Sequence, residues 1–387
     1  MNRRIRLFLA ALLAAAVMAA SATAAVSSEL PKTMAVTAYD VGSGGYSQAI
    51  AVGAAFKNNL GVTMRILPGK NDVSRMVPLR EDKVDFSFNG IGTYLGQEAV
   101  DIFATRDWGP QETRILVMAV ADNCTGQFVA ADTGVKTLAD LKGKRVAFVK
   151  GSAALNINTL SHLRFGNLTW DDVQAVEVGG NAAAFDAVLN NQADSFFTTT
   201  TAGNVLKIQN SPRGLVFPPL PHDDEAGWSR LKEVAPYMFK HMCTESAGNL
   251  PPWEGAIYPY PVVMSYADDD AGKAYAMTKA MFEQYPHYKD AAPSANGYAL
   301  DKQILNWVVP FHEGAIRYYK EVGKWTPEIQ AHNDGLVRRQ QVLRDLWKEF
   351  LGSNPPSDHK AFGEAWMAKR YAGMKQAGLN PVWERFE

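Results

Sequence analysis

Two glycine-serine turns carry the residue types and spacing best suited to binding chemistry in this sequence. Gly42-Ser43-Gly44 lies between a predicted strand and a predicted helix, and Gly151-Ser152 repeats the arrangement further along the chain. Backbone N–H groups and a serine hydroxyl at a helix N-terminus stabilise an anion, because the helix dipole is positive there. Each turn alone is also explained as a tight connection with a capping serine. As a matched pair they predict a carboxylate site contacted by Ser43, Gly44 and Ser152.

Four other polar or aromatic residues stand at the ends of predicted strands or the starts of predicted helices. Asn181 begins a helix, and Thr198 and Thr199 follow a strand. Tyr258 flanks a crossing between two predicted lobes. Each has a structural explanation as well, because Asn caps helices, Thr caps loops and aromatic residues near hinges often belong to the core. All four are candidate ligand contacts.

Motifs for cofactor, metal or catalytic chemistry are incomplete or missing from the sequence. Ser47 stands where a dinucleotide-binding fingerprint needs its third glycine, and no acidic residue ends the following strand. The sequence has no P-loop, no G-x-S-x-G elbow, no H-E-x-x-H and no C-x-x-C, and its seven histidines form no ligand-spaced cluster. We therefore expect no cofactor, no metal and no catalytic residue.

The length and charge of the chain limit the class of protein. Its 387 residues exceed the usual ~150 residues of one domain, so two domains are expected. The 39 Lys and Arg nearly balance the 40 Asp and Glu, and 47% of the residues are hydrophobic. This composition excludes a disordered tail, and the lack of a basic run beyond the N-terminus argues against a nucleic-acid binder.

The N-terminus has the order of a secretory signal peptide. Three arginines precede an apolar run over residues 7–20, and small residues follow. This order predicts a signal peptide over residues 1–24, cleaved after Ala24. The 14 apolar residues are too few to cross a membrane, which takes about 20, and no second such run follows. We expect a periplasmic protein that is not itself embedded in a membrane.

Two cysteines, Cys124 and Cys243, are present in the sequence. In an oxidising compartment they form either one disulfide or two buried free thiols. Both fall near the predicted crossings of the second lobe, which would favour the bond. The spacing alone does not choose between the alternatives.

The hydrophobic pattern of the chain indicates one α/β architecture present twice. The first copy has strands at 34–39, 63–67 and 84–88 and helices at 46–58 and 72–80, the latter capped by Asp72. The second copy has strands at 145–149, 174–178 and 193–197 and helices at 153–165 and 181–192. Such alternation predicts parallel sheets. Four residue pairs share a spacing of 109: Gly42 and Gly151, Ser43 and Ser152, Asp85 and Asp194, and Phe88 and Phe197.

Two crossings and a tail complete the predicted organisation. Strands at 114–120 and 257–266 lead between the lobes and form a hinge over a cleft. Helices at 270–285 and 306–319 return to the first lobe, and the second of them is interrupted by Pro310 and contains His312 as a structural residue. Thr326 and Ser357 cap two tail helices. The predicted units are a signal peptide at 1–24, lobe 1 at 25–121 and 257–323, lobe 2 at 122–256 and a C-terminal helical extension at 324–387.

Four short sequence motifs are spread over residues 34–323. They are GSGGY at 42–46, VDFSFN at 84–89, LADLKGKRV at 138–146 and VPFHEGAIRYYKEVG at 309–323. Together they resemble the TAXI family of extracytoplasmic solute receptors. The resemblance implies a two-lobed α/β type II periplasmic binding protein, or Venus flytrap. Such a protein closes on a small acid, often glutamate-like or a dicarboxylate, and delivers it to a TRAP-type membrane permease.

The resemblance also implies further ligand contacts and shows where this chain departs from the family. A tyrosine that contacts the ligand usually follows the first turn, and either Tyr46 or Ser47 occupies that place. Asn89 stands where the family more often has glutamine. The second turn is commonly Gly-Ser-Gly-Thr, whereas this chain continues with Ala153-Ala154 and then Asn156. Glutamate is therefore not carried over as the ligand.

The sequence thus predicts a monomeric solute-binding protein for an amino acid or organic acid, with a TRAP-type permease as its membrane partner. Two other classes remain open. One is a binding module that serves a membrane sensor, which gene neighbourhood would distinguish. The other is a secreted cleft enzyme, which turnover by the purified protein would reveal.

Overall fold

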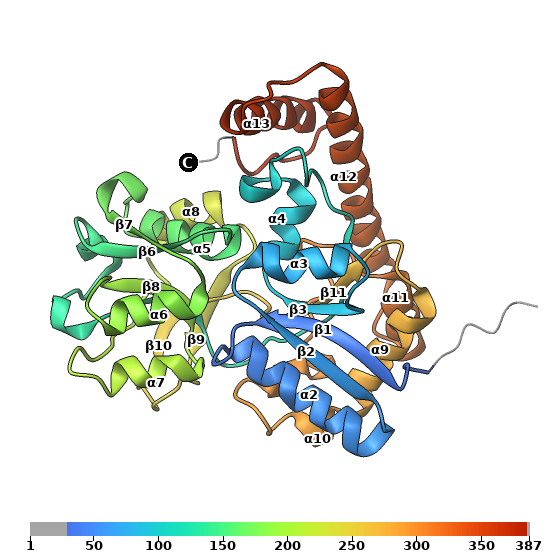
Figure 1. The fold of residues 1–387 in the computed structure, drawn as a ribbon, viewed down its shortest axis with the longest axis horizontal. Coiled ribbons are helices and arrows are strands. Elements are labelled where there is room, and N and C mark those ends of the chain that lie inside the picture. The colour runs from blue at the N-terminus through green and yellow to red at the C-terminus, as the bar shows by residue number, and fades with distance from the viewer. Residues whose placement is uncertain (1–28, 385–387) are drawn as a thin grey trace, which may run out of the picture.

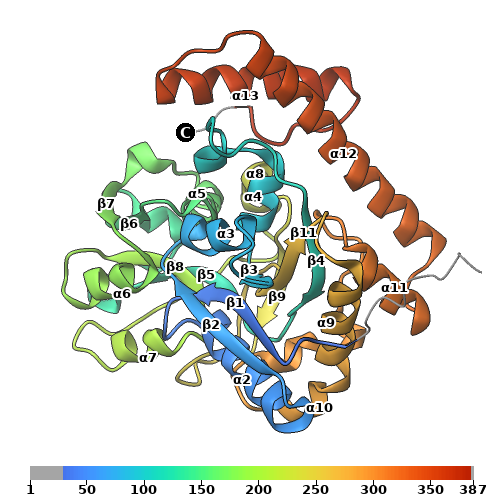
Figure 2. The same ribbon diagram turned by 45° about the vertical axis from the view of Figure 1, so that its right-hand side comes forward.

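Two α/β lobes and a helical extension make up the described part of the chain (Figure 1). The computed structural model describes residues 29–384, and the predicted signal peptide lies outside the described residues. Lobe 1 is built on a five-stranded sheet and lobe 2 on a four-stranded sheet. Figure 2 shows the extension, α12 (Pro327–Gly352) and α13 (His359–Gln376), along the outside of lobe 1.

The sheet of lobe 1 has the strand order β2-β1-β3-β11-β4. Its strands are β1 (Thr33–Tyr39), β2 (Thr63–Gly69), β3 (Phe86–Asn89), β4 (Thr113–Met118) and β11 (Val262–Tyr266). β1 lies parallel to β2 and β3, whereas β11 lies antiparallel to β3 and β4. The helices are α2 (Gly44–Leu60), α3 (Asp72–Arg80), α4 (Gly92–Glu98), α9 (Ala271–Glu283), α10 (Tyr285–Tyr288) and α11 (Glu313–Glu321).

Lobe 2 repeats this plan with the order β5-β8-β6-β7. Its strands are β5 (Thr125–Val129), β6 (Arg145–Val149), β7 (Gln174–Val178) and β8 (Ser195–Thr199), with β9 (Phe239–Cys243) and β10 (Trp253–Ile257) as a separate antiparallel pair. The helices are α5 (Ala153–Phe165), α6 (Asn181–Leu189), α7 (Gly203–Gln209) and α8 (Glu225–Val234). The order β7-β6-β8-β5 in lobe 2 corresponds to the order β2-β1-β3-β11 in lobe 1. The predicted two-lobed α/β fold is therefore confirmed.

The two glycine-serine turns have the same local geometry in both lobes. Gly42 and Gly151 adopt φ angles of +89° and +71°, which glycine tolerates without strain. The Ser43 hydroxyl accepts a hydrogen bond from the N–H of Tyr46 at 3.2 Å, and Ser152 occupies the same capping position on α5. The common spacing in the sequence therefore reflects equivalent strand-to-helix turns.

The hinge consists of two neighbouring segments, residues 119–124 and 258–261. The N–H of Tyr260 donates to the carbonyl of Ala119 at 2.8 Å, and the N–H of Ala119 donates to the carbonyl of Pro261 at 2.9 Å. The single strand predicted at 257–266 is wrong, because β10 ends at Ile257 and β11 begins at Val262. Pro261 has no N–H to donate, which favours a break there.

The structure joins Cys124, beside the hinge, to Cys243 at the end of β9 in a disulfide, with a Cα–Cα distance of 5.4 Å and a sequence separation of 119. Closing a loop of this length restricts the unfolded chain and is expected to stabilise the fold by about 4–5 kcal/mol. We expect urea unfolding of the double variant Cys124→Ser/Cys243→Ser to show a loss near this value. Two alkylated thiols in the unfolded, unreduced protein would contradict the bond.

The predicted helix at 306–319 begins later than expected. α11 starts at Glu313, and His312 is its N-cap, whose ring accepts from the N–H of Gly314 at 3.1 Å. Proline disfavours a helical conformation in the residue before it and has no N–H for a helix. The segment around Pro310 instead pairs with β4, where the N–H of Ile115 donates to the Pro310 carbonyl at 2.9 Å.

Two predicted helix caps are also wrong by one residue. Asn71, not Asp72, caps α3 by accepting from the N–H of Ser74 at 2.9 Å. Asp358, not Ser357, caps α13. In both cases the neighbouring residue supplies the acceptor, and this leaves the Asp72 carboxylate available for contacts outside its own helix.

The extension is held to lobe 1 by a buried ionic cluster. Glu98, at the end of α4, is fully buried and accepts from Arg339 of α12 at 2.6 and 2.7 Å. Arg370 of α13 pairs with the same carboxylate. Trp366 of α13 donates its indole N–H to the carbonyl of Ala99 at 2.8 Å. A buried cluster of this kind fixes the position of the extension relative to lobe 1.

Candidate functional site

A small cavity of about 30 Å³ lies between the lobes. Lobe 1 contributes Tyr39, Ser43, Gly44, Arg75, Gly90 and Ile91; lobe 2 contributes Ala154, Leu155, Asn181, Phe197, Thr198 and Thr199; the hinge contributes Tyr258 and Tyr260. Many of these residues end strands or begin helices at the carboxyl edges of the two sheets, where open α/β sheets bind ligands. The cavity holds only a few water-sized groups, so the lobes are closed on each other.

Arg75 of α3 is the principal charged residue of the cavity lining. Its side chain is fully buried, and its guanidinium lies over the ring of Tyr39 at 3.8 Å from the centroid. One terminal nitrogen donates to Asp72 at 2.5 Å. Among the described residues, its Nε atom has no hydrogen-bond partner. A buried cation with an unused donor is suited to receive an anion.

Asp72 connects this arginine to the second lobe. Its other oxygen accepts from the N–H of Ala154 at 2.8 Å and from the Ser152 hydroxyl at 3.2 Å. A carboxylate of lobe 1 therefore occupies the N-terminus of α5, the place where the sequence predicts a ligand carboxylate. Ser152 is also 3.0 Å from the hydroxyl of Tyr39 and does not line the cavity.

Asp40 makes the corresponding contact with the next helix of lobe 2. Its carboxylate accepts from the N–H of Ala182, in the first turn of α6, at 3.0 Å. Close by, the N–H of Asn181 donates to the carbonyl of Lys70 of lobe 1 at 3.1 Å. Asn181 is thus the first residue of α6, and Gly180 holds the cap position. An acidic side chain of lobe 1 therefore accepts a hydrogen bond at the N-terminus of α5 and another at the N-terminus of α6.

Three tyrosines, Tyr39, Tyr258 and Tyr260, line the cavity together with Arg75. Burial raises the pKa of Tyr260 to about 12 and also raises the pKa of Tyr39 and of Tyr258. The phenols therefore stay protonated at neutral pH and can donate or accept hydrogen bonds. The hydroxyl of Tyr258 accepts from Asn158 of α5 at 3.1 Å.

The structure brings together six of the residues singled out from the sequence. Those that line the cavity are Ser43, Gly44, Asn181, Thr198, Thr199 and Tyr258. The others lie outside it. The Asn89 side-chain oxygen accepts a hydrogen bond from the N–H of Gly90. The Asn156 side chain accepts from the N–H of Val149 and donates to its carbonyl.

Tyr46 and Ser47 do not line the cavity either. Both are half-buried on α2, and the Ser47 hydroxyl donates to the carbonyl of Ser43 at 3.2 Å. The sequence reasoning missed Arg75, Tyr39 and Tyr260. A signal was available for Arg75, because it follows Asp72 by three residues and an Asp–Arg pair at that spacing shares one helix face.

Neither a metal centre nor a membrane span is present in the part of the chain that the structure describes. Over residues 29–384, no group of three or more His, Cys, Asp or Glu side chains is placed to hold a metal ion. Within the same residues, no helix combines the length and apolar character that crossing a bilayer requires.

Comparisons with known proteins find a family match. The chain matches the NMT1-like family over residues 47–323, well over half of its length. No curated protein matches it in sequence.

Three solved structures have a related arrangement at low identity. The alkanesulfonate-binding protein SsuA from Xanthomonas axonopodis pv. citri, bound to MOPS, is 15% identical, with 83% of this chain and 93% of that chain covered and a TM-score of 0.45. The periplasmic aliphatic sulphonate binding protein SsuA from Escherichia coli is 18% identical, with coverages of 82% and 87% and a TM-score of 0.42. An ancestral arginine-binding protein bound to arginine is 15% identical, with coverages of 69% and 96% and a TM-score of 0.41.

Proposed function

The chain belongs to the NMT1-like family, and on this premise we propose that it is an extracytoplasmic solute-binding protein that captures a small carboxylate between its two lobes. The observation that carries the proposal is Arg75, a fully buried residue that lines the interlobe cavity and whose guanidinium has an unpartnered Nε. A guanidinium matches the planar geometry of a carboxylate, and a charge-assisted hydrogen bond is strong where water is excluded.

The N-terminus of α2 is the second part of the proposed carboxylate site. Ser43 and Gly44 line the cavity there, and the first turn of α2 contains no acidic residue that would compete with a ligand. The lobe 2 turn is different, because Asp72 already occupies it. The ligand carboxylate is therefore placed on lobe 1, and the rest of the ligand meets the polar residues of lobe 2 and the hinge, namely Asn181, Thr198, Thr199 and Tyr258.

The cellular setting is proposed from the sequence. The signal-peptide pattern at residues 1–24 supports a periplasmic location. The motifs at 42–46, 84–89, 138–146 and 309–323 support a receptor of the TAXI type, which would deliver its ligand as a monomer to a TRAP-type membrane permease. The ligand itself is an amino acid or another organic acid.

A thermal-shift screen of the purified protein tests the proposed ligand class. We expect at least one small carboxylate to raise the melting temperature, because a ligand at 100 times its Kd stabilises the folded state by about 2.7 kcal/mol. Matched amides and alcohols, which lack the negative charge, serve as controls. No shift with any amino acid or organic acid, or equal shifts with the amide analogues, would contradict a carboxylate receptor.

Ser43→Ala is expected to weaken binding of the identified carboxylate about tenfold or more. The hydroxyl already accepts from Tyr46 and has its own proton free for a ligand, and a hydrogen bond to a charged group contributes ~1.5–3 kcal/mol. Calorimetric titration measures the affinity. Thr326→Ala, which removes the cap of α12, is the matched control for cap loss and should leave affinity unchanged. If Ser43→Ala lowers only the melting temperature, the serine acts as a cap alone.

A further inference from the structure

The C-terminal extension has a second set of contacts that begins from its buried arginines. Arg339 donates to the carbonyl of Asn380 at 2.7 Å, and Arg370 donates to the carbonyls of Pro381 at 2.8 Å and Trp383 at 3.2 Å. The same two side chains pair with Glu98 of lobe 1. Residues 380–383 are therefore held to lobe 1 through the extension, and we call this segment the strap.

Trp383 carries the strap across to lobe 2. Its side chain is buried, with 7% exposed, and its indole N–H donates to the carbonyl of Val234 at 3.1 Å. Val234 is the last residue of α8, where helix carbonyls lack partners within the helix. The indole also packs on Tyr94 of α4, with ring centroids 5.4 Å apart. Trp383 therefore contacts both lobes at once.

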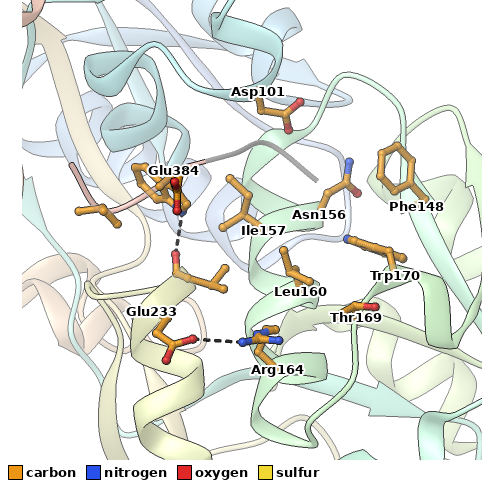
Figure 3. A pocket seen from close by; sticks show the side chains of 13 residues that line it. Asp101, Phe148, Asn156, Ile157, Leu160, Arg164, Thr169, Trp170, Glu233 and Glu384 are labelled. Carbon is orange, nitrogen blue, oxygen red and sulfur yellow. Dashed lines mark hydrogen bonds and ion pairs between the residues drawn. The ribbon is translucent and has the colours of Figure 1, made fainter. Parts of the chain in front are cut away.

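A groove of about 380 Å³ beside the strap is also lined from both sides. Figure 3 shows Asp101 of lobe 1 and Glu384 facing residues of α5, including Asn156 and Ile157, with the Arg164–Glu233 ion pair of lobe 2 below them. Separation of the lobes would widen this groove and pull Trp383 away from α8. The strap contact consequently exists only when the lobes are close together.

The strap contact lies a short distance from the ligand cavity. Tyr94 packs edge-on against Tyr237 of lobe 2, with ring centroids 6.1 Å apart. The Tyr237 hydroxyl donates to Asn158 at 2.7 Å, and Asn158 donates to Tyr258, which lines the cavity. A continuous series of side-chain contacts therefore connects Trp383 of the strap to Tyr258 in the wall of the cavity.

We propose that the strap regulates the cleft: the extension, fixed to lobe 1, stabilises the closed arrangement of the lobes through Trp383. This proposal rests on the proposed function in one respect only: the ligand is what enters and leaves when the cleft opens. A contact that forms only in the closed state shifts the equilibrium between open and closed molecules toward the closed state by the whole free energy of that contact. Loss of the indole hydrogen bond should raise the ratio of open to closed molecules about fivefold, which corresponds to ~1 kcal/mol.

Distance measurement between spin labels tests the strap without any ligand. Labels at Ile50→Cys on α2 and Leu206→Cys on α7 report on the two lobes, because both side chains are exposed, at 46% and 39%. We expect a dominant short distance in the labelled wild type. Trp383→Phe should raise a longer-distance population about fivefold, and Trp383→Ala should raise it at least as much, because the whole side chain that reaches Val234 of lobe 2 is removed.

Trp366→Phe is the matched control for the strap. It also removes an indole hydrogen bond from the extension, but its acceptor, Ala99, belongs to lobe 1. The control should leave the distance distribution unchanged. An unchanged distribution in Trp383→Ala, or an equal shift in Trp366→Phe, would overturn the proposal. Because no ligand enters the measurement, a failed carboxylate screen would contradict the proposed function and leave this result standing.

Discussion

Arg75→Met is expected to reduce the affinity for the carboxylate ligand at least 100-fold. The substitution keeps an unbranched apolar side chain in the cavity but removes the only guanidinium among its lining residues. The ligand carboxylate would lose its counter-charge in a site that excludes water, which costs ~3 kcal/mol or more. Calorimetric titration with the carboxylate found by the thermal-shift screen measures the change.

Companion variants separate loss of binding from loss of folding. Removing Arg75 alone leaves Asp72 buried without its cation, which destabilises a protein by ~3–5 kcal/mol. Arg75→Met/Asp72→Asn removes both charges and keeps an acceptor for α5, so it should fold better than the single variant and still fail to bind. Arg75→Lys should bind with intermediate affinity, because an ammonium group keeps the positive charge but not the planar array of N–H donors of a guanidinium. Wild-type affinity in a folded Arg75→Met protein would contradict the carboxylate site.

Glu98→Gln is expected to lower the free energy of unfolding at pH 7 by about 3–5 kcal/mol. The substitution leaves Arg339 and Arg370 buried without their shared counter-charge. Urea unfolding measures the loss. Glu349→Gln breaks the exposed pair with Lys369 between the same two helices and should cost less than about 1 kcal/mol. Equal losses in the two variants would contradict a special role for the buried cluster.

The same cluster makes the free energy of unfolding depend on pH. Burial alone would raise the pKa of Glu98, but the charges and hydrogen bonds of Arg339 and Arg370 lower it to about 2. A carboxyl whose pKa is lower in the folded state stabilises the fold above its usual pKa near 4.5 and loses this contribution as the pH falls from 4.5 toward 2. Stability of the wild type should therefore fall through this window by about 3 kcal/mol more than that of Glu98→Gln.

Local patterns were sufficient to predict the fold. The spacing of apolar residues placed β6, α5 and β7 at their observed bounds, because periods of two and 3.6 residues depend only on the chain's immediate neighbours. The equivalent turns at Gly42 and Gly151 were recognisable for the same reason. Where the prediction was wrong, as at the caps of α3 and α13, two adjacent residues could each supply the acceptor.

The candidate site was only partly predictable, since its decisive contacts join residues far apart in the sequence. The sequence by itself determined two lobes, a hinge and an anion-favouring turn in each lobe. Only the tertiary structure decided that Asp72 takes the second turn, 82 residues away, and that Arg75 lies in the cavity. Arg370 likewise reaches Glu98 across 272 residues. A side chain's own position in a helix or strand sets the face on which it lies, but its partner depends on how closely the two lobes and the extension pack together.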